Sequence, residues 1–267
     1  MDFEQLLRIE NENERVNKTY DIFNEDSRLN RSRAARVEFL TTVHYIEKYL
    51  KAGDKILDIG AGAGEYSLYF ASRGYEVAAL ELADANIAAF RKKISPDDTI
   101  DLIQGNALDL SRYADKFFDI VLLLGPLYHL KNDADKQQCI KEAKRVCKDG
   151  GKIFFAFISN DFVFLTEFGY DVNYFGNGHY DRETFHLEDF PFVFHTVDAA
   201  RKLLADGGVN VLHEVAADGA SELLAEKINK MRDEDYEQYL RYHLYVCEKP
   251  ELLGMTSHLL FVGEKEL

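Results

Sequence analysis

The sequence predicts an α/β fold in which a doubly wound, mostly parallel sheet is covered by helices on both faces. Short apolar runs alternate with segments of helical spacing along most of the chain, as in repeated βαβ units. The run over residues 117–124 is continuously apolar, as expected of a strand with helices against both faces. A glycine-rich turn joins the first run to a helical segment, which is typical of ligand-binding α/β sheets. With 267 residues, the chain is long enough for one such domain with an insertion.

The segment before the first strand is predicted to be mainly helical. Residues 2–16 are expected to form a short helix, followed by a loop that holds Tyr20. Apolar side chains then recur at helical spacing over residues 32–50, which predicts a helix that packs against the sheet. The first strand is expected over residues 55–59.

Three glycines follow this strand at every second position, Gly60, Gly62 and Gly64. Because glycine has no Cβ, its backbone can adopt a positive φ and a ligand can approach the main chain closely. The spacing differs from the Gly-x-Gly-x-x-Gly turn of dinucleotide-binding domains, whose last glycine would fall on Glu65. The observed Asp-x-Gly-x-Gly-x-Gly pattern, which begins at Asp58, predicts a turn that holds another nucleotide-like ligand.

Polar side chains follow the next two predicted strands. Residues 75–81 form a short apolar strand that ends on Glu81, and residues 100–105 form a strand that is followed by Asn106. The carboxyl ends of parallel strands meet at one edge of the sheet, where ligands bind. A carboxylate there can accept hydrogen bonds from ribose hydroxyls. An amide can bind adenine through its oxygen and its NH2 group.

The alternation of predicted strands and helices continues into the middle of the chain. A fourth strand over residues 117–124 ends at Gly125. A helix over residues 135–147 and a turn over residues 148–151 then lead into a fifth strand over residues 152–157.

Over roughly residues 30 to 160, the order and spacing of these motifs resemble the class I S-adenosylmethionine-dependent methyltransferases. The resemblance implies a Rossmann-like sheet of seven strands with an antiparallel last strand, and S-adenosylmethionine as the cofactor. Asn106 stands where the family more often carries aspartate. An ordinary doubly wound domain without a cofactor is the alternative, and for Tyr20 the alternative is a role in loop packing. The resemblance places these residues around the cofactor: Tyr20, Asp58, Gly60, Ala61, Gly62, Gly64, Glu81, Leu82, Asn106, Ala107, Leu124 and Gly125.

Residues 159–196 interrupt the alternation of strands and helices and are rich in aromatic side chains. Loops of more than about 15 residues are usually functional lids or disordered, and this composition argues against disorder. We expect a cap that walls an apolar or aromatic acceptor pocket; a small β-subdomain with its own aromatic core and a dimer interface are the alternatives. The predicted organisation is residues 1–158 with the N-terminal helices and the cofactor-binding half, the cap over 159–196, and residues 197–267 completing the same domain.

The sheet is expected to resume after the cap. A helix over residues 196–205, a strand over 209–215 and two charged helices within 221–246 are predicted. The last strand is expected over residues 257–263. It should lie antiparallel at the edge of the sheet, beside the fifth strand, as the family topology implies.

The charge of the chain argues against nucleic acid as a partner. The formal net charge is −15, from 47 acidic and 32 basic residues, so the chain would on balance repel a polyanion. The nearest basic group consists of Arg28, Arg31, Arg33 and Arg36. Their spacing does not keep them on one helix face, which favours a solvated helix edge.

Neither a membrane span, a disulfide nor a metal site is predicted. No window reaches about 18 uncharged apolar residues, and the first residues lack the features of a signal peptide, so we expect a cytoplasmic protein without a membrane partner. The three cysteines form no Cys-x-x-Cys pair, and Cys139 and Cys147 are expected to pack in helices. His179, His186 and His195 are too widely spaced for a typical zinc site.

The resemblance implies an SN2 transfer of the sulfonium methyl group to an O, N, S or C atom. His129 follows the fourth strand, where the family topology places the methyl group, and the ordinary pKa of histidine, about 6.5, suits a general base. Tyr128 is the second candidate, and a packing or cofactor-contact role for His129 is the alternative. The acidic charge and the aromatic cap favour a small-molecule acceptor over protein or RNA. A cofactor-binding protein without transfer activity is the third class.

Overall fold

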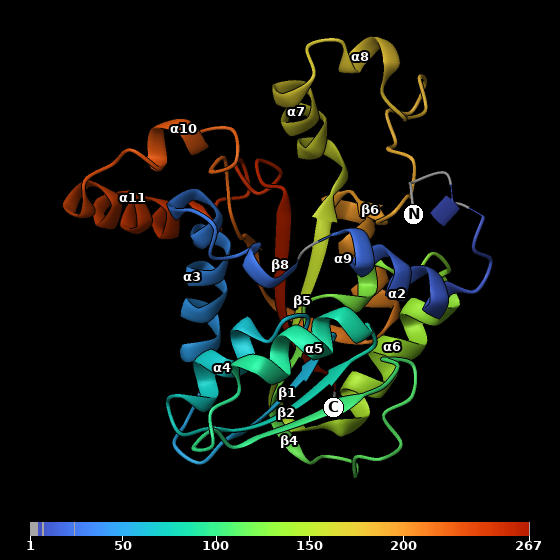
Figure 1. Cartoon of the computed structure of the whole chain (residues 1–267), viewed down its shortest axis with the longest axis vertical. Helices are drawn as coiled ribbons and strands as arrows, with labels where there is room; N and C mark the ends of the chain where they lie inside the picture. The colour runs from blue at the N-terminus through green and yellow to red at the C-terminus, as the bar shows by residue number, and fades with distance from the viewer. Residues whose placement is uncertain (1–4, 7, 24, 267) are drawn as a thin grey trace.

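The protein folds into three layers, with helices on both faces of one mixed sheet (Figure 1). The structure is a computed structural model that describes residues 5–6, 8–23 and 25–266. The strands are β1 (Lys55–Ile59), β2 (Glu76–Glu81), β3 (Ile100–Gln104), β4 (Phe118–Leu123), β5 (Cys147–Ser159), β6 (Phe194–His195), β7 (Val209–Ala216) and β8 (His258–Lys265). Neighbouring strands follow the order β3-β2-β1-β4-β5-β8-β7, and β6 pairs with the end of β5.

The sheet is parallel except at β8, which lies antiparallel between β5 and β7. This topology confirms the predicted fold class and the antiparallel last strand beside β5. The prediction that this strand lies at the sheet's edge was wrong, because β7 pairs with its other side. The predicted number of strands was wrong, because the described chain forms a sheet of eight. The additional strand comes from the cap, where Phe194 and His195 pair with Ile158 and Ser159. These last residues of β5 extend past the end of β4 and are therefore free to pair with β6.

Two clusters of buried apolar side chains fill the core, one on each face of the sheet. The helices are α2 (Glu12–Ile22), η1 (Glu25–Ser27), α3 (Arg33–Glu47), α4 (Glu65–Ala71), α5 (Asp84–Lys93), η2 (Pro126–Tyr128), α6 (Asp133–Val146), α7 (Asn160–Tyr170), α8 (Tyr174–Asn177), α9 (Val197–Asp206), α10 (Ala225–Ile228) and α11 (Asp233–Val246). One cluster joins α6 and α9 to strand residues such as Leu57 and Phe155, and the other joins α3 and α4 to Ile56 and Phe154. Adjacent strand residues therefore serve opposite faces.

β5 begins earlier than the sequence predicted. The expected turn over residues 148–151 lies within the strand, which starts at Cys147, and the pairing with β4 shifts register between Phe118 and Ile120. Cys139 and Cys147 are both buried free thiols. Cys139 packs in α6 as expected, whereas Cys147 is the first residue of β5.

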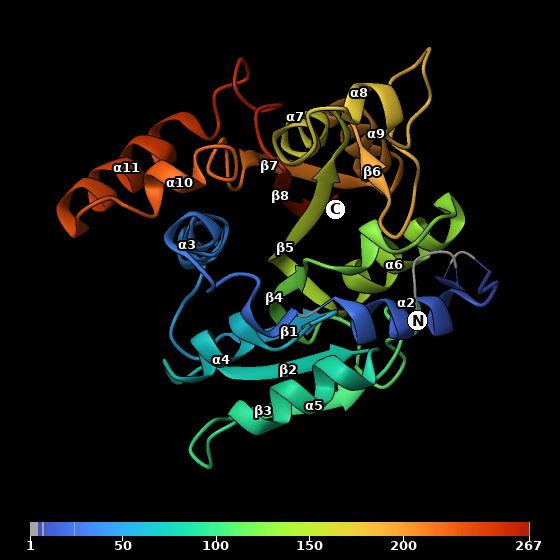
Figure 2. The same ribbon diagram turned by 45° about the horizontal axis from the view of Figure 1, so that its top comes forward.

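The segment before α3 differs from the prediction at Tyr20. Part of the helix expected over residues 2–16 lies outside the described residues, and α2 begins only after Asn11. The Asn11 side chain accepts a hydrogen bond from the backbone N–H of Glu14, so it caps the helix. Tyr20 consequently lies on α2 rather than in a loop. Figure 2 shows α2 lying across the C-terminal ends of the parallel strands.

The cap is helical, and α7 and α8 project beyond the end of the sheet (Figure 1). Val163, Phe164 and Leu187 form a small buried cluster, and the ring centroids of Phe164 and Tyr180 lie 4.8 Å apart in an edge-on arrangement. The cap thus has its own aromatic core. It is not the β-subdomain considered from the sequence, because its helices supply most of this cluster. A single bridge joins Tyr180 to Leu187.

The C-terminal elements follow the predicted order. α9 precedes β7, and α10 and α11 then extend beside α3. The chain returns to the sheet as β8 (Figure 1). None of the helices formed by the described residues is long and apolar enough to cross a membrane.

Candidate active site

Two backbone hydrogen bonds fix the glycine turn to the end of β2. The N–H groups of Gly60 and Ala61 donate to the carbonyl oxygen of Leu80, at 2.7 and 3.1 Å. The backbone φ is +73° at Gly60, +56° at Gly62 and +86° at Gly64, a region that costs other residues about 1 to 2 kcal/mol. Gly64 is the N-cap of α4, so the turn also sets where that helix begins.

Protein side chains also require glycine at two positions of the turn. A Cβ on Gly64 would lie 2.3 Å from the ring of Phe90, and a Cβ on Gly60 would lie 2.8 Å from Cδ of Pro126. The close approach of a ligand is therefore not the only reason for these glycines. Phe90 in α5 and Pro126 in η2 pack directly against the turn and hold its shape.

Glu81 ends β2 beside the turn and is only 4% exposed. Its Oε2 accepts a hydrogen bond from the N–H of Gly62, and its Oε1 accepts one from the N–H of Ala83, both at 2.8 Å. The amide of Asn86 donates to Oε1 at 3.3 Å. Burial raises the pKa of this carboxyl, and the donors partly oppose the rise. The carboxylate is thus held rigidly and still has acceptor capacity for a ligand.

Asp58 supports the turn from β1. Its Oδ2 accepts a hydrogen bond from the hydroxyl of Ser67 at 2.7 Å, which ties β1 to α4. Burial, together with the nearby charge of Glu81, raises the pKa of the Asp58 carboxyl to about 7 although the Ser67 hydrogen bond lowers it.

Two adjoining cavities flank the turn, and almost all predicted site residues line them. Cavity A lies between α2 and the C-terminal ends of the strands, and cavity B lies between the glycine turn, η1 and η2. Tyr20, Gly60 and Gly125 line both cavities. Cavity A is also lined by Glu81, Leu82, Asn106, Ala107 and His129, and cavity B by Asp58, Ala61, Gly62, Leu124 and Tyr128. The roles of these residues in binding stay predictions.

Helix α2 contributes residues to cavity A that sequence reasoning missed. Glu12, Asn13 and Val16 line the cavity together with Tyr20. Positions 12, 16 and 20 are four residues apart, so helical spacing could have indicated this face. The side-chain oxygen of Asn13 accepts a hydrogen bond from the Asn106 amide at 2.9 Å. The amide has a second N–H, so it can contact Asn13 and still donate to adenine.

Arg28 was also assigned wrongly from the sequence. Instead of lying on a solvated helix edge, it precedes α3, is half-buried and lines cavity B. Its Nε lies 2.8 Å from Glu25 Oε1, and its Nη1 lies 2.6 Å from Glu38 Oε2. The sequence offered no signal for this pairing, because it depends on how η1 packs against α3.

His129 is buried beneath α2. Its Nε2 lies 2.8 Å from the hydroxyl of Tyr20, whereas its Nδ1 has no hydrogen-bond partner among the described residues. Burial, and secondly the charge of Arg15, lower the pKa of His129 to about 3. The imidazole is therefore neutral near pH 7 but is a weak base. Burial also raises the pKa of Tyr128 well above its usual value, so this hydroxyl stays protonated.

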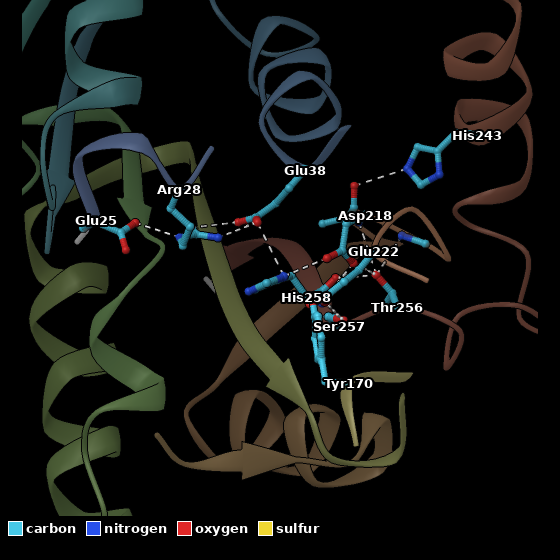
Figure 3. A network of polar contacts seen from close by, with 12 residues as sticks. Glu25, Arg28, Glu38, Tyr170, Asp218, Glu222, His243, Thr256, Ser257 and His258 are labelled. Atoms are coloured by element: carbon cyan, nitrogen blue, oxygen red, sulfur yellow. Dashed lines mark hydrogen bonds and ion pairs between the residues drawn. The ribbon is translucent and has the colours of Figure 1, made fainter. Parts of the chain in front are cut away.

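A third cavity, cavity C, has a volume of about 380 Å³ and contains a network of charged side chains (Figure 3). Nδ1 of His258 lies 2.8 Å from Asp218 Oδ2 and 3.4 Å from Glu38 Oε2. Burial lowers the pKa of His258, but the charges of Glu38 and Asp218 outweigh it and raise this pKa to about 9. Cavity C shares Arg28 with cavity B.

The cluster of Glu38, Asp218 and His258 has the spacing of a metal site, since its ligand atoms lie within 4.8 Å of one another. Arg28 already pairs with Glu38, and the protonated imidazole of His258 pairs with Asp218. A metal cation would have to displace either the Arg28 guanidinium or the His258 imidazolium and lie close to the other. The repulsion between these positive charges opposes metal binding. The histidines considered from the sequence do not belong to this cluster.

Residues 57–155 match the family model described as a methyltransferase domain. The match runs from β1 into β5 and includes the glycine turn, Glu81 and the strand ends that border cavities A and B. Residues 57–155 are therefore a methyltransferase domain. For this segment, the match confirms the methyltransferase resemblance that the motifs predicted.

The methyltransferase domain is similar to a demethylmenaquinone methyltransferase of Clavibacter sepedonicus, with 31% identity over 121 residues, 45% of this chain and 48% of the relative. A ubiquinone biosynthesis O-methyltransferase of Pseudomonas syringae pv. tomato is 31% identical over 111 residues, which are 41% of this chain and 47% of the relative. The chain thus spans about half the length of the curated relatives it matches. A solved S-adenosylmethionine-dependent methyltransferase from Methanosarcina mazei shares the fold, with a TM-score of 0.54, 20% identity and coverage of 84% and 97%.

The packing of Phe90 against the turn can be tested with two glycines of equal φ. Gly64 and Gly74 both have φ +86°, but a Cβ on Gly74 would meet nothing within 4 Å. Gly74→Ala should lower the free energy of unfolding by about 1 to 2 kcal/mol through backbone strain alone. Gly64→Ala should lose about 1 to 3 kcal/mol more because it overpacks against Phe90. Urea denaturation measures both values, and equal losses would show that Phe90 does not constrain the turn.

The depressed pKa of His129 predicts an acid-sensitive contribution to stability. The folded-state pKa of about 3 lies below the unfolded value of about 6.5, so this contribution is present above pH 6.5 and is lost as the pH falls. Between pH 7.5 and pH 5.0, the wild type should lose about 2 kcal/mol through His129. His129→Gln should lose correspondingly less over the same interval in urea denaturation. The same loss in both proteins would mean that His129 is not buried in its neutral form.

Proposed function

We propose that the protein is an enzyme that transfers the methyl group of S-adenosylmethionine to a small-molecule acceptor. The observation that carries this proposal is the buried carboxylate of Glu81, which is fixed beside the glycine turn where cavities A and B adjoin. The names of the two curated relatives, which refer to menaquinone and ubiquinone, support a small-molecule acceptor. The identity of the acceptor does not follow from them.

The groups around cavities A and B fit the cofactor chemically. Glu81 would accept hydrogen bonds from the ribose hydroxyls, and Leu82 and Ala107 offer apolar contacts for the adenine ring. Arg28 borders cavity B and offers a guanidinium for the carboxylate of the methionine part. When bound, the cofactor supplies a methyl group on a sulfonium centre, which is already electrophilic.

The protein would then contribute alignment and exclusion of water. Helix α2 covers the ends of the strands, and the contact between Tyr20 and His129 joins this helix to the end of η2. Holding two reactants in line contributes about 7 to 11 kcal/mol to lowering a barrier. His129, with its pKa of about 3, suits a role in contact and packing better than one as a base.

The net charge of −15 favours a small molecule over RNA and supports the proposal that no nucleic acid takes part. A cytoplasmic location is part of this proposal. A protein- or RNA-modifying methyltransferase and a non-catalytic binder of S-adenosylmethionine are the alternatives.

Ligand-induced stabilisation tests the binding site. S-adenosylhomocysteine at about 100 times its Kd should stabilise the protein by about 2.7 kcal/mol, and NAD should have no effect. Glu81→Ala should weaken binding by about 1.5 to 3 kcal/mol because it removes charge-assisted hydrogen bonds. Glu76→Ala, at the exposed start of the same strand, is the matched control. Stabilisation by NAD but not by S-adenosylhomocysteine would contradict the proposal, as would unchanged binding by Glu81→Ala.

Labelled methyl transfer tests the acceptor class. The purified protein would be incubated with methyl-labelled S-adenosylmethionine and with separated small-molecule, protein and RNA fractions of a cell extract. We expect the label in the small-molecule fraction only. Label in protein or RNA supports the corresponding alternative, and binding of S-adenosylhomocysteine without any transfer supports a non-catalytic binder.

A further inference from the structure

Cavity C is not explained by cofactor binding. It lies between α3, the end of α7, α10 and the start of β8, and Arg28 connects it to cavity B. Tyr170, the last residue of α7, contributes to its wall from the cap. The cavity therefore adjoins the predicted cofactor site on one side and the predicted acceptor cap on the other.

Asp218 and His258 form an oriented pair at this cavity (Figure 3). Asp218 Oδ1 accepts hydrogen bonds from the His258 backbone N–H, at 3.1 Å, and from the hydroxyl of Thr256. Asp218 Oδ2 lies 2.8 Å from Nδ1 of His258. A carboxylate in this position keeps the proton of the neutral imidazole on Nδ1 and leaves the Nε2 lone pair available.

Nε2 of His258 has no hydrogen-bond partner among the described residues, and His258 lines the cavity. We propose that cavity C holds the methyl acceptor and that Nε2 of His258 accepts the acceptor's proton. The inference rests on the proposed methyl transfer and deepens it. Asp218 is a positioning residue, because it acts through His258.

The reaction balances without another reactant. The acceptor's O–H or N–H bond breaks and its proton moves to Nε2 of His258. The electron pair of the acceptor atom forms the bond to the methyl carbon, and the carbon–sulfur bond breaks with its electrons left on sulfur. The sulfonium charge is thereby lost, the imidazole becomes positive, and the proton later passes to solvent.

The charges around His258 set the pH range in which it can act as a base. Burial and Arg28 lower its pKa, whereas Glu38 from α3 and Asp218 from the segment after β7 raise it, with a result of about 9. The imidazole is therefore mostly protonated near pH 7, and its neutral, basic form becomes abundant only as the pH approaches 9. The other charged or titratable residues that line the cavity are Arg31, Tyr170 and Glu222.

The test compares pH–rate profiles of the full-length wild type, His258→Gln and Asp218→Asn from pH 6 to pH 10. Methyl-labelled S-adenosylmethionine is saturating, and the small-molecule fraction of a cell extract is the acceptor source. The wild-type rate should rise up to about pH 9 and then level off. His258→Gln should lower the plateau rate by about 100-fold or more, with the Kd of S-adenosylhomocysteine within threefold of wild type.

Asp218→Asn separates titration of His258 from titration of the acceptor. Loss of the Asp218 charge should lower the pKa of His258 and move the midpoint of the profile down by at least about one pH unit, whereas an acceptor's own midpoint would not move. His213→Gln is the matched control, because His213 also pairs with a carboxylate, that of Glu248, but does not line cavity C. Its profile should equal that of the wild type.

Several results would overturn the inference. One such result is a His258→Gln variant with the same rate and the same pH–rate profile as the wild type. Another is an Asp218→Asn variant whose pH–rate profile has the same midpoint as that of the wild type. Melting curves identify a variant that does not fold. If neither variant folds, the pKa of His258 in the wild type with S-adenosylhomocysteine is measured by NMR titration. It should equal the midpoint of the wild-type rate profile, and a clear difference between the two would contradict the inference. Binding of S-adenosylhomocysteine without transfer by the wild type would contradict this inference and the proposed transfer but not the cofactor site.

Discussion

The position of the glycine turn against β2 is the constraint on which the rest of the site depends. Gly60 and Ala61 donate to the carbonyl of Leu80, so the turn has one register relative to the strand that carries Glu81. That register lets the Glu81 carboxylate reach the N–H of Gly62. A shift of one residue in β2 would turn this carboxylate to the other face of the sheet and remove the acid from both cavities.

A second, charged constraint joins segments that are distant in sequence. Arg28, before α3, pairs with Glu38, and Glu38 faces His258 at the start of β8. Asp218 completes this network from the segment after β7. Buried charges are costly unless they are paired, so the network fixes these three segments relative to one another. It also places Arg28 between cavity B, where the cofactor is expected, and cavity C, where we place the acceptor.

The parts of the site that local patterns describe could be predicted from the sequence. The glycine turn, Glu81 at the end of β2 and the order of β1 to β5 follow from apolar runs and the residues that end them. The structure departs from prediction where long-range contacts decide. β6 forms because β5 extends past β4, Arg28 is half-buried because Glu25 and Glu38 surround it, and Asp218 meets His258 only through the pairing of β7 with β8.

A crystal structure of the protein with S-adenosylhomocysteine is the most direct test of the central claim, that cavities A and B together form the cofactor site. The account predicts ribose hydroxyls within hydrogen-bond distance of Glu81, adenine in cavity A, and the methionine part in cavity B near Arg28. A ligand bound elsewhere, or one in these cavities that leaves Glu81 without a contact, would contradict it.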